Sequence, residues 1–209
     1  MASYLASYRP LAITKRGRLA AHRLGIPPFV DGSCRREPDL QSDRPSITAL
    51  CRAHMFAPRL QRNDEVAYIT VKSTFGERCE GHYRLVAHLK VFDLSAFYEE
   101  VVDWYRTHAL EIPSNCMVSG SRPIAYEGTN GRNDGRYRGM PEDVKLHFWD
   151  GEYRKRARRI GCFVHCQPLF VELYTPPSAI RPGLRRNLRA CAWHSHASRA
   201  ALSRGPSAR

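Results

Sequence analysis

Within residues 31–70, a segment that is rich in charged and polar residues, two cysteines stand directly beside arginines. Cys34 precedes Arg35 and Arg36, and Cys51 precedes Arg52. A nearby positive charge favours the thiolate over the thiol, and the thiolate is the nucleophilic form of cysteine. This segment is therefore a candidate site for nucleophilic chemistry.

A covalent mechanism can be written with these groups. A cysteine thiolate would add to an electron-poor base carbon, while an arginine stabilises the developing negative charge. The carboxylate of Asp31 or Glu37 would transfer a proton. In the alternative interpretation the cysteines are small buried hydrophobic residues, and the arginines are exposed or paired with acids. The candidate catalytic residues are Asp31, Cys34, Arg35, Cys51, Arg52 and Cys116.

A second set of basic and aromatic side chains could contact nucleic acid. Residues 128–139 contain four glycines and three arginines, which is typical of a mobile loop. A base outside the stack needs an aromatic pocket, and Trp104 and Trp149 are available for it beside two tyrosines. Runs of charge on helices are more often solvated faces, which is the alternative. The candidate nucleic-acid-binding residues are Tyr68, Tyr83, Arg132, Arg136, Arg154 and Arg158.

Nearly all of the net charge of +13 belongs to the two ends of the chain. Residues 1–30 contain five basic and no acidic residues, and residues 178–209 contain seven arginines and no acid. Neither end shows sustained apolar periodicity. We therefore expect a basic arm at 1–28 and a basic, disordered tail at 178–209, which either grip phosphates or are solvated ends without a function. A single domain is expected between them, at 29–177.

Apolar periodicity predicts strands in three parts of this domain. Residues 65–72 are rich in β-branched and aromatic side chains, and residues 83–92 alternate between apolar and polar ones. Such alternation is typical of an antiparallel strand with one solvent-facing side. Residues 162–174 again have strand character, which Pro168 interrupts.

Helices are expected between these strands. Ser95 can cap a helix that ends before Pro113, and Asp150 can cap a second helix at 151–160 with a strongly basic surface. The predicted fold class is α+β: a mostly antiparallel curved sheet with at least two packed helices.

Motifs for common cofactors and metals are absent from the sequence. There is no Walker motif and no glycine-rich dinucleotide fingerprint, so no cofactor is expected. Cys162 and Cys166 lie in a predicted strand, where four residues span about 13 Å, too far for both thiolates to bind one ion. No metal site is expected. The spread of seven cysteines, with no membrane span and no signal peptide, predicts a soluble cytoplasmic protein with reduced thiols and no membrane partner.

A series of short motifs follows a characteristic order along the chain. Residues 31–34 read DGSC, residues 46–52 read SITALCR, residues 56–59 read FAPR, and Asn63-Asp64 precedes a predicted strand. This order resembles the opening of bacterial and phage domains called nucleotide-modification-associated. IPSNCMV (112–118) and WDGEYRKRAR (149–158) are similar to uncharacterised bacterial proteins of the same type. The likeness covers about residues 29–177, with Asn63 standing where the family favours glycine.

The resemblance implies a role in DNA base hypermodification, a PUA-like barrel and a nucleic-acid partner, for which DNA is favoured while the choice between DNA and RNA stays open. Two functions remain open. The protein could be a base-modifying enzyme that uses a cysteine thiolate, or a non-catalytic PUA-like module that reads a modified base by stacking and edge contacts. A protein-interaction module without a nucleic-acid role is a third possibility. The base, the group donor and the oligomeric state stay open.

Overall fold

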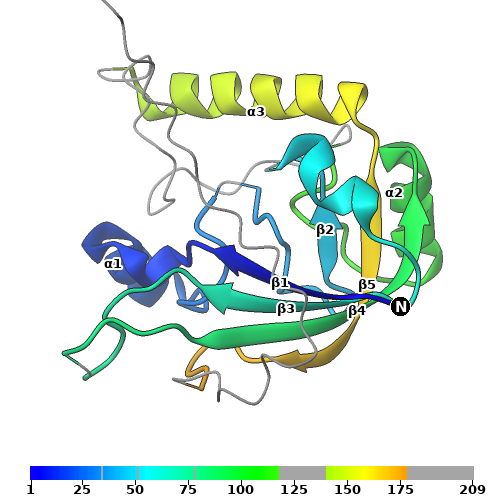
Figure 1. Cartoon of the computed structure of the whole chain (residues 1–209). Helices are drawn as coiled ribbons and strands as arrows, with labels where there is room; N and C mark the ends of the chain where they lie inside the picture. Colours follow the sequence, from blue (N-terminus) through cyan, green and yellow to red (C-terminus); the bar gives the residue numbers. More distant parts are fainter. Residues whose placement is uncertain (34, 51, 78, 118–139, 178–209) are drawn as a thin grey trace, which may run out of the picture.

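Five strands form one curled sheet in the computed structural model of the chain, which describes residues 1–33, 35–50, 52–77, 79–117 and 140–177. The sheet order is β1-β3-β4-β5-β2, and only the β1–β3 pair is parallel among these neighbours. The sheet bends into a half-barrel, with helices packed around it (Figure 1). The predicted α+β class, with a mostly antiparallel curved sheet and at least two helices, is confirmed. The strands are β1 (Ser3–Tyr8), β2 (Ser46–Thr48), β3 (Glu65–Thr70), β4 (Leu85–Ser95) and β5 (Phe163–Val171).

The central strands follow the apolar pattern of the sequence. Val86, Leu89 and Val91 of β4 are buried, whereas Phe92 is exposed. β4 continues to Ser95, so this residue ends a strand and does not cap the next helix as expected. Helix α2 (Tyr98–Thr107) begins after Phe97, which makes no side-chain capping bond.

Helix α3 (Glu142–Arg159) is longer than the sequence pattern predicts. Asp150, the expected N-cap, lies inside the helix, and the chain enters the helix at Pro141. Proline is tolerated at a helix start because the N–H groups of the first turn have no acceptor within the helix, so the N–H that proline lacks is not needed there. Ala157 is buried and Tyr153 packs against the same apolar cluster, so these two side chains form part of the inward face of the helix.

Residues of the expected N-terminal arm take part in the fold. Strand β1 pairs with β3 along its whole length: Ser3 lies opposite Glu65, and Tyr8 lies opposite Thr70. The prediction that residues 1–28 form an arm separate from the domain is therefore wrong for the residues of β1. Helix α1 (Lys15–Leu24) follows β1 at one end of the sheet (Figure 1). The α1 helix is capped by the Thr14 hydroxyl, which accepts from the N–H of Gly17 at 2.9 Å, and it ends at Gly25 in a left-handed conformation (φ 64°). Glycine adopts that conformation without a steric cost.

Two main apolar clusters hold the layers together. One fills the hollow of the curled sheet with residues such as Tyr8, Phe56 and Val66, and the other lies between α2, α3 and Phe163. A further small helical turn (Leu11–Ile13) joins β1 to α1, and two more (Ala53–Met55 and Ala57–Arg59) precede β3. Within the described ranges, no helix has both the length and the apolar character needed to cross a bilayer.

Candidate functional site

Asp31 is the first polar residue of a buried network that begins just after β1 and α1. Its side chain is 6% exposed, and its carboxylate accepts hydrogen bonds from the N–H of Ser33 (2.8 Å), the Ser33 hydroxyl and the N–H of Glu37 (3.1 Å). Arg36 donates to the Asp31 carbonyl at 2.5 Å. Burial raises the pKa of Asp31 to about 6, although these hydrogen bonds and Arg36 oppose the shift.

Glu37 lies at the centre of the same network. Its carboxylate accepts from the N–H of Thr48 at 2.9 Å, from the Thr48 hydroxyl, and from the side-chain amide of Asn115 at 3.3 Å. The amide oxygen of Asn115 accepts in turn from the hydroxyl of Ser46 at 2.8 Å. Burial, with a smaller contribution from Asp31, raises the pKa of Glu37 to about 8.

Arg35 joins this loop to the segment around residue 115. Its fully buried guanidinium donates to the Ser114 carbonyl at 3.1 Å. The Asp39 carboxylate accepts from both the N–H and the hydroxyl of Ser114 at 3.0 Å. Charged hydrogen bonds inside the protein thus hold together two segments that are about 75 residues apart in sequence. Arg35 and Asp39 therefore have a structural role.

Cys116 lies beside this junction but is not activated by it. The thiol is buried and donates to the Tyr98 carbonyl at 3.6 Å. Burial raises the pKa of Cys116 to about 12, and the opposing effect of Arg35 is smaller. A thiolate is therefore strongly disfavoured at Cys116 at neutral pH.

The remaining candidate catalytic residues are only partly placed. Cys34 and Cys51 lie outside the described residues. Arg52 is half-buried; its guanidinium donates to the Ser7 carbonyl and lies 5.4 Å from the ring centre of Phe56. The structure thus brings Asp31, Arg35 and Cys116 to one buried polar region.

The candidate nucleic-acid-binding residues do not form one group. Tyr68 is only 2% exposed and packs edge-on against Tyr8, so its ring is closed to a base, whereas Tyr83 is 45% exposed. Arg154 and Arg158 are exposed on α3. Arg132 and Arg136 lie outside the described residues, as does the side chain of Trp149, and Trp104 stacks on His108 at 4.1 Å.

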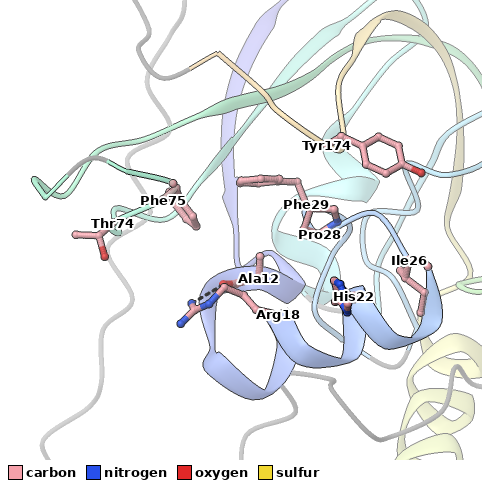
Figure 2. Close-up of a pocket in the computed structure, with 12 residues that line it drawn as sticks. Ala12, Arg18, His22, Ile26, Pro28, Phe29, Thr74, Phe75 and Tyr174 are labelled. Carbon is pink, nitrogen blue, oxygen red and sulfur yellow. Dashed lines mark hydrogen bonds between the residues drawn. The ribbon is translucent and has the colours of Figure 1, made fainter.

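A cavity of about 770 Å³, which the sequence analysis missed, opens between α1, the β3–β4 loop and the segment that follows β5. Figure 2 shows aromatic rings on its upper side and Arg18 and His22 of α1 below them. The described residues that line it include no acid. Its lining consists of Ala12, Arg18, Ala21, His22, Gly25, Ile26, Pro28, Phe29, Thr74, Phe75, Gly76 and Tyr174.

One sequence signal for this cavity was present. Arg18 and His22 are four residues apart, a spacing that places both on one face of a helix. In the sequence, this segment stands out only for its basic charge. The aromatic residues come from three distant loops, and nothing in their spacing connects them.

Metal binding has no support among the described residues, where no group of three or more His, Cys, Asp or Glu side chains could hold an ion. Comparisons of the chain with protein-family models, with curated proteins and with solved structures found no match.

Proposed function

We propose that the protein is a nucleic-acid-binding module that recognises a base without catalysing a reaction, in the setting of DNA base modification that the motif order suggests. The observation that carries this proposal is helix α1. It contains Lys15, Arg16, Arg18 and Arg23 and no acid, and it lies beside an open cavity with aromatic walls.

Hydrogen bonds fix the position of helix α1, which carries these basic side chains. The Thr14 cap fixes the start of the helix, and Arg18 donates to the Ala12 carbonyl at 3.0 Å. The four basic side chains themselves are exposed. Cations in this state displace counterions when they meet phosphates, and counterion release supplies much of the affinity for nucleic acid.

Helix α3 is the competing basic surface, and part of its charge is already engaged within the protein. Arg156 donates to the Leu50 carbonyl, and Lys155 forms an ion pair with Glu152 at 3.2 Å. Arg158 and Arg159 stand in the last turn of α3, where a positive charge interacts favourably with the helix dipole. These contacts give part of the charge of α3 a structural explanation.

The salt dependence of binding tests the proposal. We expect single- and double-stranded DNA to bind with an affinity that falls steeply as salt rises. The triple variant K15Q/R16Q/R23Q should make the slope of log affinity against log salt shallower by about 2 to 3 units for duplex DNA. The matched control R62Q/K90Q/R106Q removes the same charge elsewhere and should leave the slope nearly unchanged.

Two results would overturn this proposal. If neither DNA nor RNA binds, the protein-interaction alternative replaces it. The other result is that R154Q/K155Q/R158Q makes the slope of log affinity against log salt shallower and K15Q/R16Q/R23Q does not. In that case the phosphates of the nucleic acid bind to α3, and the assignment of α1 as the binding surface is wrong.

A second candidate function, modification of the base, is favoured by the raised pKa values of Asp31 and Glu37. Carboxyls with raised pKa values are common at catalytic sites, although buried structural networks produce them as well. A cysteine nucleophile would leave a covalent protein–DNA adduct. Mass spectrometry of the protein after incubation with DNA should show an adduct on Cys34 or Cys51 if this function is correct, and none if the protein only reads the base.

A further inference from the structure

The cavity beside α1 has two fixed aromatic walls. Phe29 and Phe75 are both buried, and their ring centres lie 5.4 Å apart at an angle of 54°. The Phe29 N–H donates to the Leu173 carbonyl at 3.0 Å, and its carbonyl accepts from the Tyr8 hydroxyl. Backbone bonds on both sides of Phe29 therefore hold this wall in position before any ligand arrives.

Arg84 contacts the residues of both aromatic walls. Its guanidinium carbon lies 5.6 Å from the ring centre of Phe29, and it donates to the Phe75 carbonyl at 3.4 Å. It also donates to the Pro176 carbonyl, close to Tyr174 in the chain. One side chain thus links three segments that surround the cavity, which makes its aromatic side a rigid surface.

Tyr174 supplies an aromatic side chain that is still open to a ligand. It is 62% exposed, and its N–H donates to the Glu172 carboxylate at 2.7 Å. Figure 2 shows its ring at the edge of the cavity, on the same side as Phe29. A planar ring that enters the cavity could cover this exposed apolar surface.

The opposite side of the cavity is cationic. Arg18 uses one nitrogen to bond the Ala12 carbonyl at 3.0 Å, which fixes its guanidinium at the rim. His22 is exposed one helical turn further along α1. Since the described lining residues include no acid, this rim suits an anionic group such as a phosphate.

We propose that this cavity binds a nucleoside monophosphate unit, with the base against Phe29, Phe75 and Tyr174 and the phosphate at Arg18 and His22. This inference deepens the proposed function and rests on it. The volume of about 770 Å³ falls within the usual range for small-molecule sites. The unit is either a free nucleotide or one residue of a single strand, because both present the same base and phosphate.

The charge of the C-terminal segment of this chain argues against that segment as the occupant of the cavity. Residues 178–209 contain seven arginines and no acid. Such a segment would be repelled by the cations of α1, whereas a nucleotide brings the opposite charge.

Calorimetric titration of the full chain with dAMP, dCMP, dGMP and dTMP tests the inference, with the four nucleosides and inorganic phosphate as separate arms. At least one nucleotide should bind more tightly than its nucleoside and more tightly than phosphate. Tyr174→Ala should weaken nucleotide and nucleoside binding by about 10-fold, because it removes a stacking surface. Arg18→Gln should weaken nucleotide binding by about 10-fold and leave nucleoside binding unchanged, because it removes a contact to the phosphate.

Matched controls are available on other surfaces. Phe97 is 63% exposed and Arg106 is exposed near the end of α2, so Phe97→Ala and Arg106→Gln should each change the affinity by less than about 2-fold. A ten-residue single strand that displaces the bound nucleotide would identify a strand residue as the ligand. Failure to displace it would identify a free nucleotide.

The inference is overturned if no nucleotide binds, or if Tyr174→Ala and Arg18→Gln bind as well as their controls. In that case a steep salt slope that K15Q/R16Q/R23Q flattens would still support nucleic-acid binding through α1. Conversely, saturable nucleotide binding without any affinity for DNA or RNA would support the cavity and contradict the proposed function.

Discussion

Gly17 of α1 lies so close to Leu11 that a Cβ atom at this position would stand 1.8 Å from the Leu11 carbonyl oxygen. The helix therefore packs directly on the backbone of the preceding turn. This contact fixes α1, and with it Arg18 and His22, relative to the end of β1.

The first prediction compares two glycines within helices. Gly17→Ala should lower the free energy of unfolding by about 1–3 kcal/mol, because the new methyl group would collide with backbone atoms. Gly151→Ala in α3 should raise it by about 0.5–1 kcal/mol, since nothing lies within 4 Å of a Cβ there and alanine favours helix. Urea denaturation of both variants measures the difference. Equal effects would mean that α1 is not packed as described.

The second prediction concerns the pH dependence of stability. Because the folded protein raises the pKa of Glu37 to about 8 and that of Asp31 to about 6, it binds protons more tightly than the unfolded chain does. Stability from these groups is complete below pH 4 and is lost as the pH rises towards 8. The melting temperature of the wild type should therefore fall between pH 5 and pH 8. Glu37→Gln should reduce that fall above pH 6, and an unchanged pH profile would contradict the assignment.

The third prediction tests the junction at Asn115. This side chain is fully buried and bonds to Glu37 and to Ser46. Asn115→Ala should lower the free energy of unfolding by about 2–4 kcal/mol, because buried polar groups lose their partners. The control Gln41→Ala alters an exposed side chain and should stay within about 0.5 kcal/mol. A loss below about 1 kcal/mol at Asn115 would show that the two segments are not held together there.

The fourth prediction concerns thiol reactivity. In the native protein, iodoacetamide should modify the exposed Cys79 and spare Cys116, Cys162 and Cys166, because burial raises the pKa of each of these three thiols. Peptide mass spectrometry after brief labelling gives the extent at each site. Rapid labelling of Cys116 at neutral pH would return it to the list of candidate nucleophiles. The same experiment compares the reactivity of Cys34 and Cys51, each of which precedes an arginine, with that of Cys79, which follows Arg78.

The fifth prediction concerns residues 178–209. Truncation after Pro177 should flatten the salt dependence of DNA binding, because it removes seven uncompensated arginines, and it should leave the melting temperature nearly unchanged. Filter binding over a salt series and thermal denaturation measure the two effects. An unchanged slope would identify an end without a role in binding, and an unfolded product would mean that apolar residues such as Leu184 and Trp193 belong to the core.

The fold was predictable wherever a single segment carries its own pattern. Alternation revealed β4, and helical spacing revealed α2 and the second half of α3. Strand β1 was missed because residues 1–28 stand out in the sequence for their basic charge, and β1 becomes a strand by pairing with β3 some sixty residues away. Strand β2 has only three residues, too few for any period.

For the buried polar network, the sequence predicted the region of the chain but not the residues that contact it. The polar residues near Asp31 and Arg35 were visible in the sequence, but their hydrogen-bond partners Ser114 and Asn115 lie far along the chain. The cavity beside α1 is harder still to find, because it takes Phe29, Phe75 and Tyr174 from three separate loops. Each of these residues alone looks like an ordinary aromatic residue in a loop.

The mutual hydrogen bonds of Glu37, Thr48, Ser46 and Asn115 also limit how this protein can evolve. Replacing one member leaves another buried polar group without its partner, whereas exchanging the whole group for apolar residues of similar shape costs far less. Sequences in which only some of these four residues are replaced should therefore be less stable than sequences that keep all four or exchange all four. Among related sequences these four positions should change together or not at all, and that covariation would join residues 37–48 to residue 115 without any structure.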